Sequence, residues 1–424
     1  MFSVCPTFGK FQFLKEELSM PSSLNATPSG ERVHIGLFGC RNAGKSSLIN
    51  AITGQDLAIV SDYKGTTTDP VSKAMEILPL GPVLLTDTPG MDDDTDLGQS
   101  RIEKARMVLR STDIALLVVD ASTGMNAFDR KLLQEIRDRK IPYLVVFNKC
   151  DLVPSFTLPE DLKDYSMLVS AQAGTQIWEL KERISQALGK DGVKKPLLLD
   201  LLEPNALVVL VVPCDESAPK GRLILPQQQT IRELLDGHCS AVVVQPQELT
   251  GIISLLGKKI SLVVTDSQAF HTVNQMVPPD IRLTSCSILF ARYKGQLAAF
   301  LDGALKLKDL KDGDPVLISE GCTHHRQCND IGTVKLPNWI RKYSGAQPDF
   351  HYSSGKGFPD DLSPFKLIVH CGACMLNPQE VAYRQGAAHK QNIPMTNYGI
   401  AIACMNGILP RVLAPFPGLA EKVK

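Results

Sequence analysis

Gly39-Cys40-Arg41-Asn42-Ala43-Gly44-Lys45-Ser46 fits the pattern G-x-x-x-x-G-K-S of a loop that binds nucleotide phosphates. The apolar run from Val33 to Phe38 predicts a buried strand before this loop, and residues 47–52 predict a helix after it. The glycines allow successive backbone N–H groups to turn inward on a polyphosphate. Lys45 can then reach the β and γ oxygens, and the Ser46 hydroxyl can bind Mg²⁺. The stretch therefore predicts a P-loop at a strand-to-helix turn.

Two further motifs follow at predicted strand ends, in the order that a guanine-nucleotide site requires. Residues 84–90 are an apolar run ending in D-x-x-G, where Asp87 can hold Mg²⁺ through water and the Gly90 N–H can sense a γ-phosphate. Residues 143–151 end in N-K-x-D, and the Asp151 carboxylate can accept two hydrogen bonds from guanine. Adenine lacks that donor pair, so ATP leaves the carboxylate unpaired at a cost of about 1–3 kcal/mol. These motifs favour GTP over ATP.

A fourth motif completes the predicted base site. Ser170-Ala171 follows the apolar run Met167–Val169 and is placed to offer a backbone N–H to the guanine O6. Together the four motifs predict a GTP-binding domain. Its candidate nucleotide-binding residues are Gly39, Asn42, Gly44, Lys45, Ser46, Ser47, Asn148, Lys149, Asp151, Ser170 and Ala171.

Composition limits the remaining possibilities. A chain of 424 residues is too long for one domain. A formal net charge of zero argues against a general nucleic-acid or anionic-membrane binder. No segment has the apolar length of a membrane span, and the first 20 residues lack the apolar core of a secretory signal. We therefore expect a cytoplasmic protein without a membrane partner, whose eleven cysteines serve as metal ligands or buried thiols rather than disulfides.

The apolar pattern divides the chain into four parts with an α/β fold. We predict a flexible leader over residues 1–30, a P-loop GTPase domain with a mostly parallel sheet over 31–192, a smaller α/β domain over 197–292 and a third α/β domain over 293–424. In the second domain the runs 207–212, 241–244, 262–264 and 287–290 predict the strands of a parallel sheet. Thr230 to Glu233 has the spacing of a capping box and predicts a helix start. Because the second domain carries no site motif, we expect it to be an assembly or spacer module, with pairing of two copies of the chain as one such role.

The third domain has cysteine motifs after two predicted strands. Residues 315–319 lead into Cys322-Thr323-His324-His325, and residues 365–369 lead into His370-Cys371-Gly372-Ala373-Cys374. Open α/β sheets bind ligands at such strand ends. The C-x-x-C turn can bring two thiolates to one metal centre, and Cys322 can bring a third.

These residues leave several metal chemistries open. Three thiolates with one exchangeable ligand suit a 4Fe–4S cluster, whereas C-x-x-C alone also suits half of a structural zinc site or a redox dithiol. His324 and His370 are candidate ligands, with a hydrogen-bonded core histidine as the alternative for each. The pattern does not identify the fourth cluster ligand.

Both sites resemble known families. The nucleotide site resembles the GTPase branch of MnmE, Era and Der, and Gly65-Thr66-Thr67-Thr68-Asp69-Pro70 is similar to their G-T-T-R-D switch segment. The set Cys322, His324, His370, Cys371 and Cys374 is similar to the cluster motif of the HydF family, the GTPase maturases of iron–iron (FeFe) hydrogenase. The resemblance runs from about Val33 to the end and has the order GTPase domain, dimerisation domain and cluster domain.

The resemblance implies roles for several residues. Thr67 is the expected switch threonine that closes on Mg²⁺ and the γ-phosphate, although Thr68 stands where relatives usually carry Arg. Lys45, Thr67, Asp87 and Gly90 are thus the residues expected to act in hydrolysis. Asn42 matches the P-loop Asn that helps to bind K⁺ in the MnmE-like branch. Met91 stands where Ras-like enzymes have a water-orienting Gln, which implies slow intrinsic hydrolysis, whereas Asn42 implies that K⁺ stimulates it.

The same resemblance implies a function. It suggests a homodimeric GTP-hydrolysing scaffold that assembles the diiron subcluster and delivers it to apo FeFe-hydrogenase, with radical-SAM maturases as further partners. The implied cofactors are GTP, Mg²⁺, K⁺ and a 4Fe–4S cluster. The alternative is an RNA-linked GTPase of tRNA modification or ribosome assembly with a C-terminal zinc site. Against that alternative stand the zero net charge and the lack of a basic stripe in residues 200–424.

Overall fold

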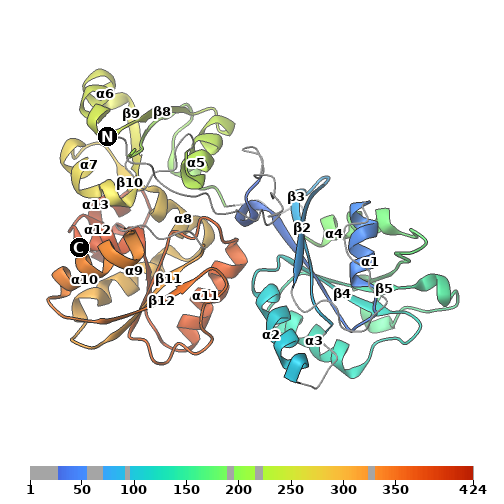
Figure 1. Cartoon of the computed structure of the whole chain (residues 1–424). Helices are drawn as coiled ribbons and strands as arrows, with labels where there is room; N and C mark the ends of the chain where they lie inside the picture. The colour runs from blue at the N-terminus through green and yellow to red at the C-terminus, as the bar shows by residue number, and fades with distance from the viewer. Residues whose placement is uncertain are drawn as a thin grey trace, which may run out of the picture.

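The computed structural model describes residues 27–54, 70–90, 96–188, 195–214, 223–322 and 330–423, with only the backbone for residues 96–99. The described chain contains three sheets, one of six strands and two of four. Figure 1 shows the six-stranded sheet in one lobe and the two smaller sheets together in a second lobe. Each sheet carries helices on its faces.

The first sheet belongs to the GTPase unit and has the strand order β2-β3-β1-β4-β5-β6, with only β2 antiparallel to its neighbour. Central strands such as β4 are buried along almost their whole length, as expected for parallel strands covered on both faces. The elements are β1 (Val33–Phe38), α1 (Lys45–Thr53), β2 (Val71–Ile77), β3 (Gly81–Asp87), α2 (Asp96–Arg110), β4 (Ile114–Asp120), α3 (Ala127–Asp138), β5 (Tyr143–Asn148), β6 (Ser166–Leu168) and α4 (Ile177–Ala187).

Two apolar cores lie on opposite faces of this sheet. Ile35 and Leu37 of β1 pack into the core that α1 and α4 cover, whereas Phe38 packs into the core that α2 and α3 cover. Such alternation along one strand follows from the two-residue period of β structure. The polar loops after β1, β3 and β5 therefore gather at the carboxyl edge of the sheet, where the nucleotide motifs lie.

The second and third sheets have the same topology. Their strand orders are β8-β7-β9-β10 and β12-β11-β13-β14, and every pairing is parallel. Strands β7 to β10 thus correspond in order to β11 to β14. One continuous apolar core runs through both units from Leu197 to Phe416, so the two sheets form a single lobe with a repeated motif.

The elements of this lobe follow the same alternation of strand and helix. They are β7 (Leu207–Val211), α5 (Leu225–Asp236), β8 (Ser240–Val244), α6 (Leu249–Leu256), β9 (Ile260–Thr265), α7 (Phe270–Met276), β10 (Leu283–Ser285), α8 (Cys286–Lys294), α9 (Leu297–Leu305), β11 (Pro315–Glu320), α10 (Leu336–Ser344), β12 (Asp349–Ser354), β13 (Leu367–His370), α11 (Pro378–Lys390), β14 (Met395–Asn397), α12 (Tyr398–Met405) and α13 (Leu409–Leu413).

The predicted α/β fold class, with a mostly parallel GTPase sheet followed by two smaller α/β units, is confirmed. Two local predictions are wrong. Residues 287–290 lie in α8 rather than in a strand, because this helix is buried on nearly all sides and so has an unbroken apolar run. Thr230 lies inside α5, which begins at Leu225, and its hydroxyl donates to the Pro226 carbonyl instead of capping a helix.

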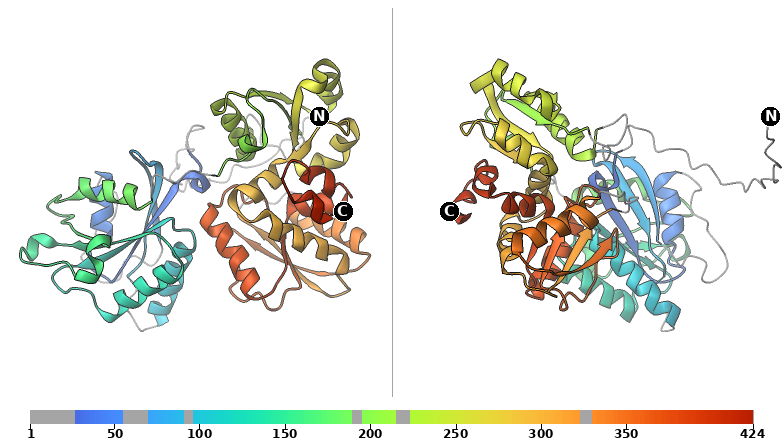
Figure 2. Two further views of the ribbon diagram at one scale, coloured as in Figure 1. Left: turned by 180° about the vertical axis from the view of Figure 1, so that it is seen from behind. Right: turned by 60° about the vertical axis from the view of Figure 1, so that its left-hand side comes forward.

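Two predicted boundaries also differ from the observed elements. The division at residue 292 falls within α8, whose last residue, Lys294, reaches into the third unit. Gly30, at the end of the predicted leader, is buried against residues 374–376. In the described part of the chain, no helix is long and apolar enough to cross a membrane. Figure 2 shows the lobes from two further sides, with α2 and α11 at the junction between them.

Candidate nucleotide site and thiol site

The P-loop has the backbone geometry that phosphate binding requires. Gly39 has φ +138° and lies so close to the Val118 carbonyl that a Cβ would be 2.2 Å from that oxygen. Gly44 has φ +88°, and a Cβ there would lie 2.2 Å from the Asn148 side-chain nitrogen. Only glycine fits at these two positions. The exposed Asn42 has φ +58°, a left-handed conformation that Asn tolerates better than most residues.

Lys45 is held across this loop. Its ammonium donates to the Gly39 carbonyl at 2.9 Å and to the Cys40 carbonyl at 2.7 Å, and the side chain is buried. A cation held among carbonyls at the start of α1 can turn to phosphate oxygens, which are stronger acceptors. The position agrees with the role predicted for Lys45.

Ser46 and Asp87 bring two suitable Mg²⁺ ligands together. The Ser46 hydroxyl donates to Asp87 Oδ2 at 2.5 Å, while Oδ1 has no hydrogen-bond partner in the described part of the chain. Burial raises the pKa of Asp87, and the Ser46 hydrogen bond and the charges of Lys45 and Lys73 oppose that shift. A buried carboxylate oxygen without a partner beside a hydroxyl fits a divalent cation. The residues present therefore fit Mg²⁺.

Gly90 packs directly against the P-loop. A Cβ at this position would lie 2.3 Å from Arg41 Cγ and 2.9 Å from the Arg41 backbone nitrogen. The D-x-x-G segment is also tied to β1, because the Thr88 hydroxyl donates to the Leu37 carbonyl at 2.6 Å. The structure thus brings the predicted γ-phosphate sensor beside the phosphate loop, where a side chain would prevent the approach.

The base-recognition residues form a connected set. Asn148 Nδ2 donates to the Ala43 carbonyl at 3.0 Å, and its Oδ1 accepts from the Ala171 N–H at 3.0 Å. Lys149 donates to Asp120 at 2.5 Å. Burial opposes ionisation of Asp120, but hydrogen bonds from Lys149 and Ser122 outweigh it and lower the pKa of this carboxyl.

Of the two predicted contacts to the base, one group is open to a ligand and the other is already hydrogen-bonded. Asp151 is exposed at the mouth of this set, in a position open to a ligand. The Ala171 N–H, predicted to meet the guanine oxygen, is occupied by Asn148, and the neighbouring Ser170 N–H donates to the Thr175 carbonyl. Asn148, Ala43 and Ala171 therefore link the phosphate loop to the base site. Thr67, Thr68, Met91, His324 and His325 lie outside the described residues.

The predicted thiols lie at the carboxyl ends of adjacent strands. Strands β11 and β13 pair in parallel, with Ser319 opposite His370, so the turns that carry Cys322 and Cys371 leave the same edge of the sheet. The Cys371 sulfur accepts hydrogen bonds from the Gly321 N–H at 3.1 Å and the Ala373 N–H at 3.4 Å. Backbone N–H donors of this kind stabilise a thiolate, as iron–sulfur and zinc sites require.

Electrostatics keep the thiols protonated in this arrangement. Burial raises the pKa of Cys371 to about 11, partly opposed by its two N–H donors. Burial, followed by repulsion from Cys371, Cys374 and Glu320, raises the pKa of Cys322 to about 12. Burial also raises the pKa of Cys374, against the charge of Lys294. The three thiols thus lie near enough to influence one another electrostatically, and a bound metal ion would favour their thiolate forms.

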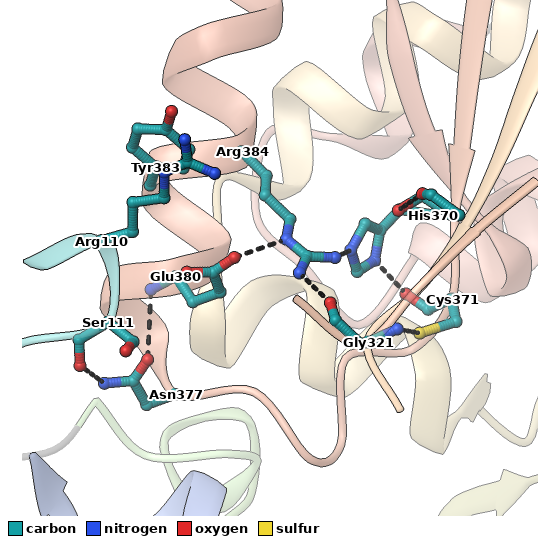
Figure 3. A network of polar contacts seen from close by, with 12 residues as sticks. Arg110, Ser111, Gly321, His370, Cys371, Asn377, Glu380, Tyr383 and Arg384 are labelled. Carbon is teal, nitrogen blue, oxygen red and sulfur yellow. Dashed lines mark hydrogen bonds and ion pairs between the residues drawn. The ribbon is translucent and has the colours of Figure 1, made fainter. Parts of the chain in front are cut away.

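His370 is placed as a hydrogen-bonded core residue. Its Nδ1 donates to the Cys371 carbonyl at 2.9 Å, and its Nε2 accepts from the buried Arg384 guanidinium at 3.0 Å (Figure 3). Burial and the charge of Arg384 lower the pKa of His370 to about 3, so the ring is neutral near pH 7. Both ring nitrogens are occupied, and the ligand role predicted for His370 would require one of these bonds to break.

The C-x-x-C turn is clamped by a buried lysine. Lys294, only 3% exposed at the end of α8, donates to the carbonyls of Ala373 at 3.1 Å, Cys374 at 2.9 Å and Leu376 at 2.6 Å. Ala373 has φ +56°, an uncommon conformation that such a clamp can hold. Sequence patterns did not reveal Lys294, because it lies 79 residues before the turn that it contacts.

The residue types of the thiol site fit a thiolate-bound metal centre, but their described side chains do not converge on one metal position. In the described ranges, no three His, Cys, Asp or Glu side chains are close enough to hold one metal ion. Binding by Cys322, Cys371 and Cys374 together therefore requires one of the two turns to move. Glu320, directly before Gly321, is a buried carboxylate beside these thiols that the sequence analysis did not single out.

Three protein-family models match successive parts of the chain. The model of a 50S ribosome-binding GTPase matches residues 34–149. The hydrogen maturase F dimerization domain matches residues 197–295, and the hydrogen maturase F tetramerization domain matches residues 298–415. The last two matches together cover about half of the chain in the order characteristic of one family. The chain belongs to the hydrogen maturase F family.

The GTPase unit of this hydrogen maturase F family member also has relatives outside the family. The tRNA modification GTPase MnmE of Synechococcus sp. (strain JA-2-3B'a(2-13)) is 38% identical over 177 residues, which is 41% of this chain and 38% of the relative. MnmE of Aquifex aeolicus (strain VF5) is 34% identical over 160 residues, 38% of this chain and 35% of the relative. The chain thus spans well under half the length of these relatives. The sequence similarity itself supports the predicted GTPase branch.

Solved structures resemble only part of this family member. A variant of Era from Aquifex aeolicus bound to GDP and AlF₄⁻ has a TM-score of 0.34 at 22% identity, covering 53% of this chain and 98% of that chain. NFeoB from S. thermophilus bound to GDP, AlF₄⁻ and K⁺ has a TM-score of 0.31 at 23% identity, covering 40% of this chain and 69% of that chain.

Proposed function

We propose that this chain is a GTP-hydrolysing scaffold of FeFe-hydrogenase maturation, with its cluster site at Cys322, Cys371 and Cys374. The observation that supports the proposal best is the thiol edge of the third sheet. There the N–H groups of Gly321 and Ala373 point at the Cys371 sulfur, in a chain that also carries a guanine-nucleotide site. The family to which the chain belongs is named for hydrogenase maturation.

Each site has a separate chemical task in this proposal. Lys45 binds the β and γ phosphates of GTP, while Ser46 and Asp87 hold Mg²⁺. Thr67, which lies outside the described residues, would complete the Mg²⁺ site, and Asn148, Lys149 and Asp151 would select guanine. At the other site the thiolates of Cys322, Cys371 and Cys374 would hold a 4Fe–4S cluster, and an exchangeable iron of that cluster would bind a diiron precursor. The protein residues hold and orient the thiols, and Lys294 places a positive charge beside them.

The partners follow from this task. The cargo is the diiron subcluster, the recipient is apo FeFe-hydrogenase and the donors are radical-SAM maturases, all within the cytoplasm. Edge strand β8 (Ser240–Val244), with Val243 42% exposed, supports pairing of two copies through the second unit.

A transfer assay tests the maturation function. The chain is isolated anaerobically from cells that also express the radical-SAM maturases and is then mixed with apo FeFe-hydrogenase. We expect hydrogen evolution to appear with this protein and to remain absent with a Cys371→Ala variant. One tightly bound zinc per chain, with no labile sulfide and no transfer, would instead support the RNA-linked GTPase alternative.

The Asp151→Asn variant tests base selection. The amide keeps one acceptor but presents a donor toward the guanine edge, so the paired acceptor geometry is lost. We expect the preference for GTP over ATP to fall by about tenfold or more, since an unmatched buried polar group costs ~1–3 kcal/mol. Competition of the two nucleotides against a fluorescent GTP analogue measures this preference. Unchanged selectivity would exclude the role given to Asp151.

The Asn42→Ala variant tests the proposed K⁺ site. Asn42 lies exposed at the rim of the P-loop, where its side-chain oxygen can bind a monovalent cation beside the transferred phosphate. We expect hydrolysis by the wild type to be faster in KCl than in NaCl at equal ionic strength, and this difference to disappear in the variant. Equal rates of the wild type in the two salts would contradict the assignment.

A further inference from the structure

The loop that carries Cys374 lies against the GTPase unit. A Cβ at Gly30 would lie 2.9 Å from the Leu376 carbonyl oxygen, 2.9 Å from the Met375 carbonyl carbon and 3.0 Å from the Cys374 carbonyl oxygen. Gly30 is therefore required by close packing rather than by its backbone conformation. Three residues later β1 begins, and β1 ends at the P-loop. The cysteine loop thus lies on the segment that leads into the phosphate site.

Asn377 joins the same loop to a second part of the GTPase unit. This side chain is 2% exposed, and its Nδ2 donates to the Ser111 carbonyl at 2.8 Å and to Asp113 Oδ2 at 3.4 Å. Its Oδ1 accepts from the Glu380 N–H and caps α11. Asp113 Oδ2 also accepts from the His34 N–H at 2.8 Å, so one carboxylate oxygen contacts both Asn377 and the start of β1.

Arg110, the last residue of α2, makes a further contact between the lobes. It forms an ion pair with Asp360, and its guanidinium lies 4.7 Å from the centre of the Tyr383 ring. The Tyr383 hydroxyl donates to Asp360 at 3.0 Å. Figure 3 shows Arg110 beside Tyr383 of α11, and Ser111 beside Asn377, the residue that precedes α11.

The inner face of α11 continues toward the thiols. Glu380 accepts from Arg384 Nε at 2.9 Å, and Arg384 Nη1 donates to His370 Nε2 at 3.0 Å. The His370 ring in turn donates to the Cys371 carbonyl. A shift of α11 or of its cap would therefore alter the backbone around both cysteines of the C-x-x-C turn.

On the GTPase side, the contact between Ser111 and Asn377 is connected to the nucleotide switch. Helix α2 is the first helix after Asp87-Thr88-Pro89-Gly90, the segment that senses a γ-phosphate in GTPases and moves when the phosphate is lost. Arg110 and Ser111 lie at its far end. The end of α2 and the segment that precedes β1 therefore both contact the loop that carries Cys374.

We propose that Asn377 and Gly30 position the Cys374 loop according to the nucleotide state. This inference deepens the proposed function, because the loop carries part of the proposed cluster site. In this structure the loop is docked against the GTPase unit, and Cys374 is only partly exposed. A γ-phosphate that draws in the D-x-x-G segment and α2 pulls on the Ser111–Asn377 bond and loosens the loop. GTP thus opens the thiol site, and hydrolysis closes it.

Thiol alkylation of the full-length, metal-free chain tests this proposal. Iodoacetamide labelling at Cys374 is followed by peptide mass spectrometry in GDP and in a non-hydrolysable GTP analogue. The exposed Cys214 of the second unit is the internal reference. We expect labelling of Cys374 to be about fivefold faster with the triphosphate, which is the lower end of coupling between sites. Equal or slower labelling with the triphosphate would overturn the proposal.

Two variants and a matched control separate coupling from general damage. Asn377→Asp keeps the oxygen that caps α11 but loses the donor to Ser111, and it brings a second carboxylate against Asp113. Gly30→Ala forces the loop away from the GTPase unit. We expect each variant to label rapidly at Cys374 in both nucleotides. Arg106→Gln, in the same helix as Arg110 but paired with Glu135 inside the GTPase unit, should keep the wild-type ratio.

Folding and nucleotide binding are checked by thermal unfolding and GTP affinity, which should match the wild type in all variants. Should Asn377→Asp and Gly30→Ala both retain the nucleotide-dependent ratio, the loop contact is not the coupling element. The assay contains no iron. A negative labelling result would therefore overturn the proposed coupling without bearing on the proposed function, which the transfer assay tests.

Discussion

Replacing Lys45 by alanine is expected to slow GTP hydrolysis by about a hundredfold or more. The Lys45 ammonium is buried at the mouth of the P-loop and donates to the carbonyls of Gly39 and Cys40. Phosphate oxygens that carry developing charge are far stronger acceptors than these carbonyls. Phosphate release under saturating GTP measures the effect on hydrolysis, and a fluorescent GTP analogue measures binding.

Lys163→Ala is the matched control for this experiment. Lys163 is two-thirds exposed and pairs with Glu160 on the surface, so its removal should leave both measurements unchanged. A Lys45→Ala protein that hydrolyses GTP within about twofold of the wild type would mean that catalysis does not depend on this P-loop geometry.

Replacing Lys294 by methionine is expected to release the C-x-x-C turn. The ammonium donates three hydrogen bonds to carbonyls of residues 373–376, and charged hydrogen bonds contribute about 1.5–3 kcal/mol each. Methionine matches the length of lysine but leaves these buried carbonyls without their donor. A loss of ~3 kcal/mol in local stability corresponds to about a hundredfold faster alkylation of Cys374 in the metal-free chain. Iron retained after reconstitution should fall in parallel.

Two further variants make the Lys294 result specific. Lys306→Met removes an exposed lysine paired with Asp309 and should change neither measurement. Lys294→Arg keeps the positive charge and the donors, so it should restore part of the iron binding that methionine loses. Wild-type alkylation and iron content in Lys294→Met would show that the clamp does not position the cysteines.

The nucleotide site could be predicted from the sequence because its motifs are local. Each consists of a strand end and the few residues after it, and parallel strands bring those ends to one edge. Asn148 shows the limit of this approach. Its motif predicted a base-recognition residue, but its bonds to Ala43 and Ala171 depend on tertiary packing. The Ala171 N–H is consequently occupied, which the motif could not show.

The thiol site could be predicted only in part. The two cysteine turns follow strands β11 and β13 as expected, whereas the residues that hold them come from distant parts of the chain. Asn377 lies 266 residues from Ser111, and no spacing pattern relates residues so far apart. The hydrogen bond from Arg384 to His370 was equally unpredictable, because the sequence does not show which residue of α11 faces the end of β13.

The repeated topology of the last two units was also invisible in the sequence. Only the strand orders reveal that β7 to β10 correspond to β11 to β14. The apolar run Ser287–Phe290 concealed this relation, because a short apolar segment is compatible with either a strand or a buried helix. In the structure that run belongs to α8, whose last residue is the clamp Lys294. A helix, and not a strand, therefore leads from the second unit to the contact between Lys294 and the cysteine turn.

We expect this one chain to carry both a guanine-nucleotide site and a three-thiolate iron–sulfur site. Iron and acid-labile sulfide are measured after anaerobic reconstitution of the wild type and of a Cys322→Ala, Cys371→Ala, Cys374→Ala variant. We expect about four irons and four sulfides per wild-type chain, almost none in the variant and equal GTP binding in both. Equal iron and sulfide contents in the two proteins, or a wild type that holds only zinc, would contradict it.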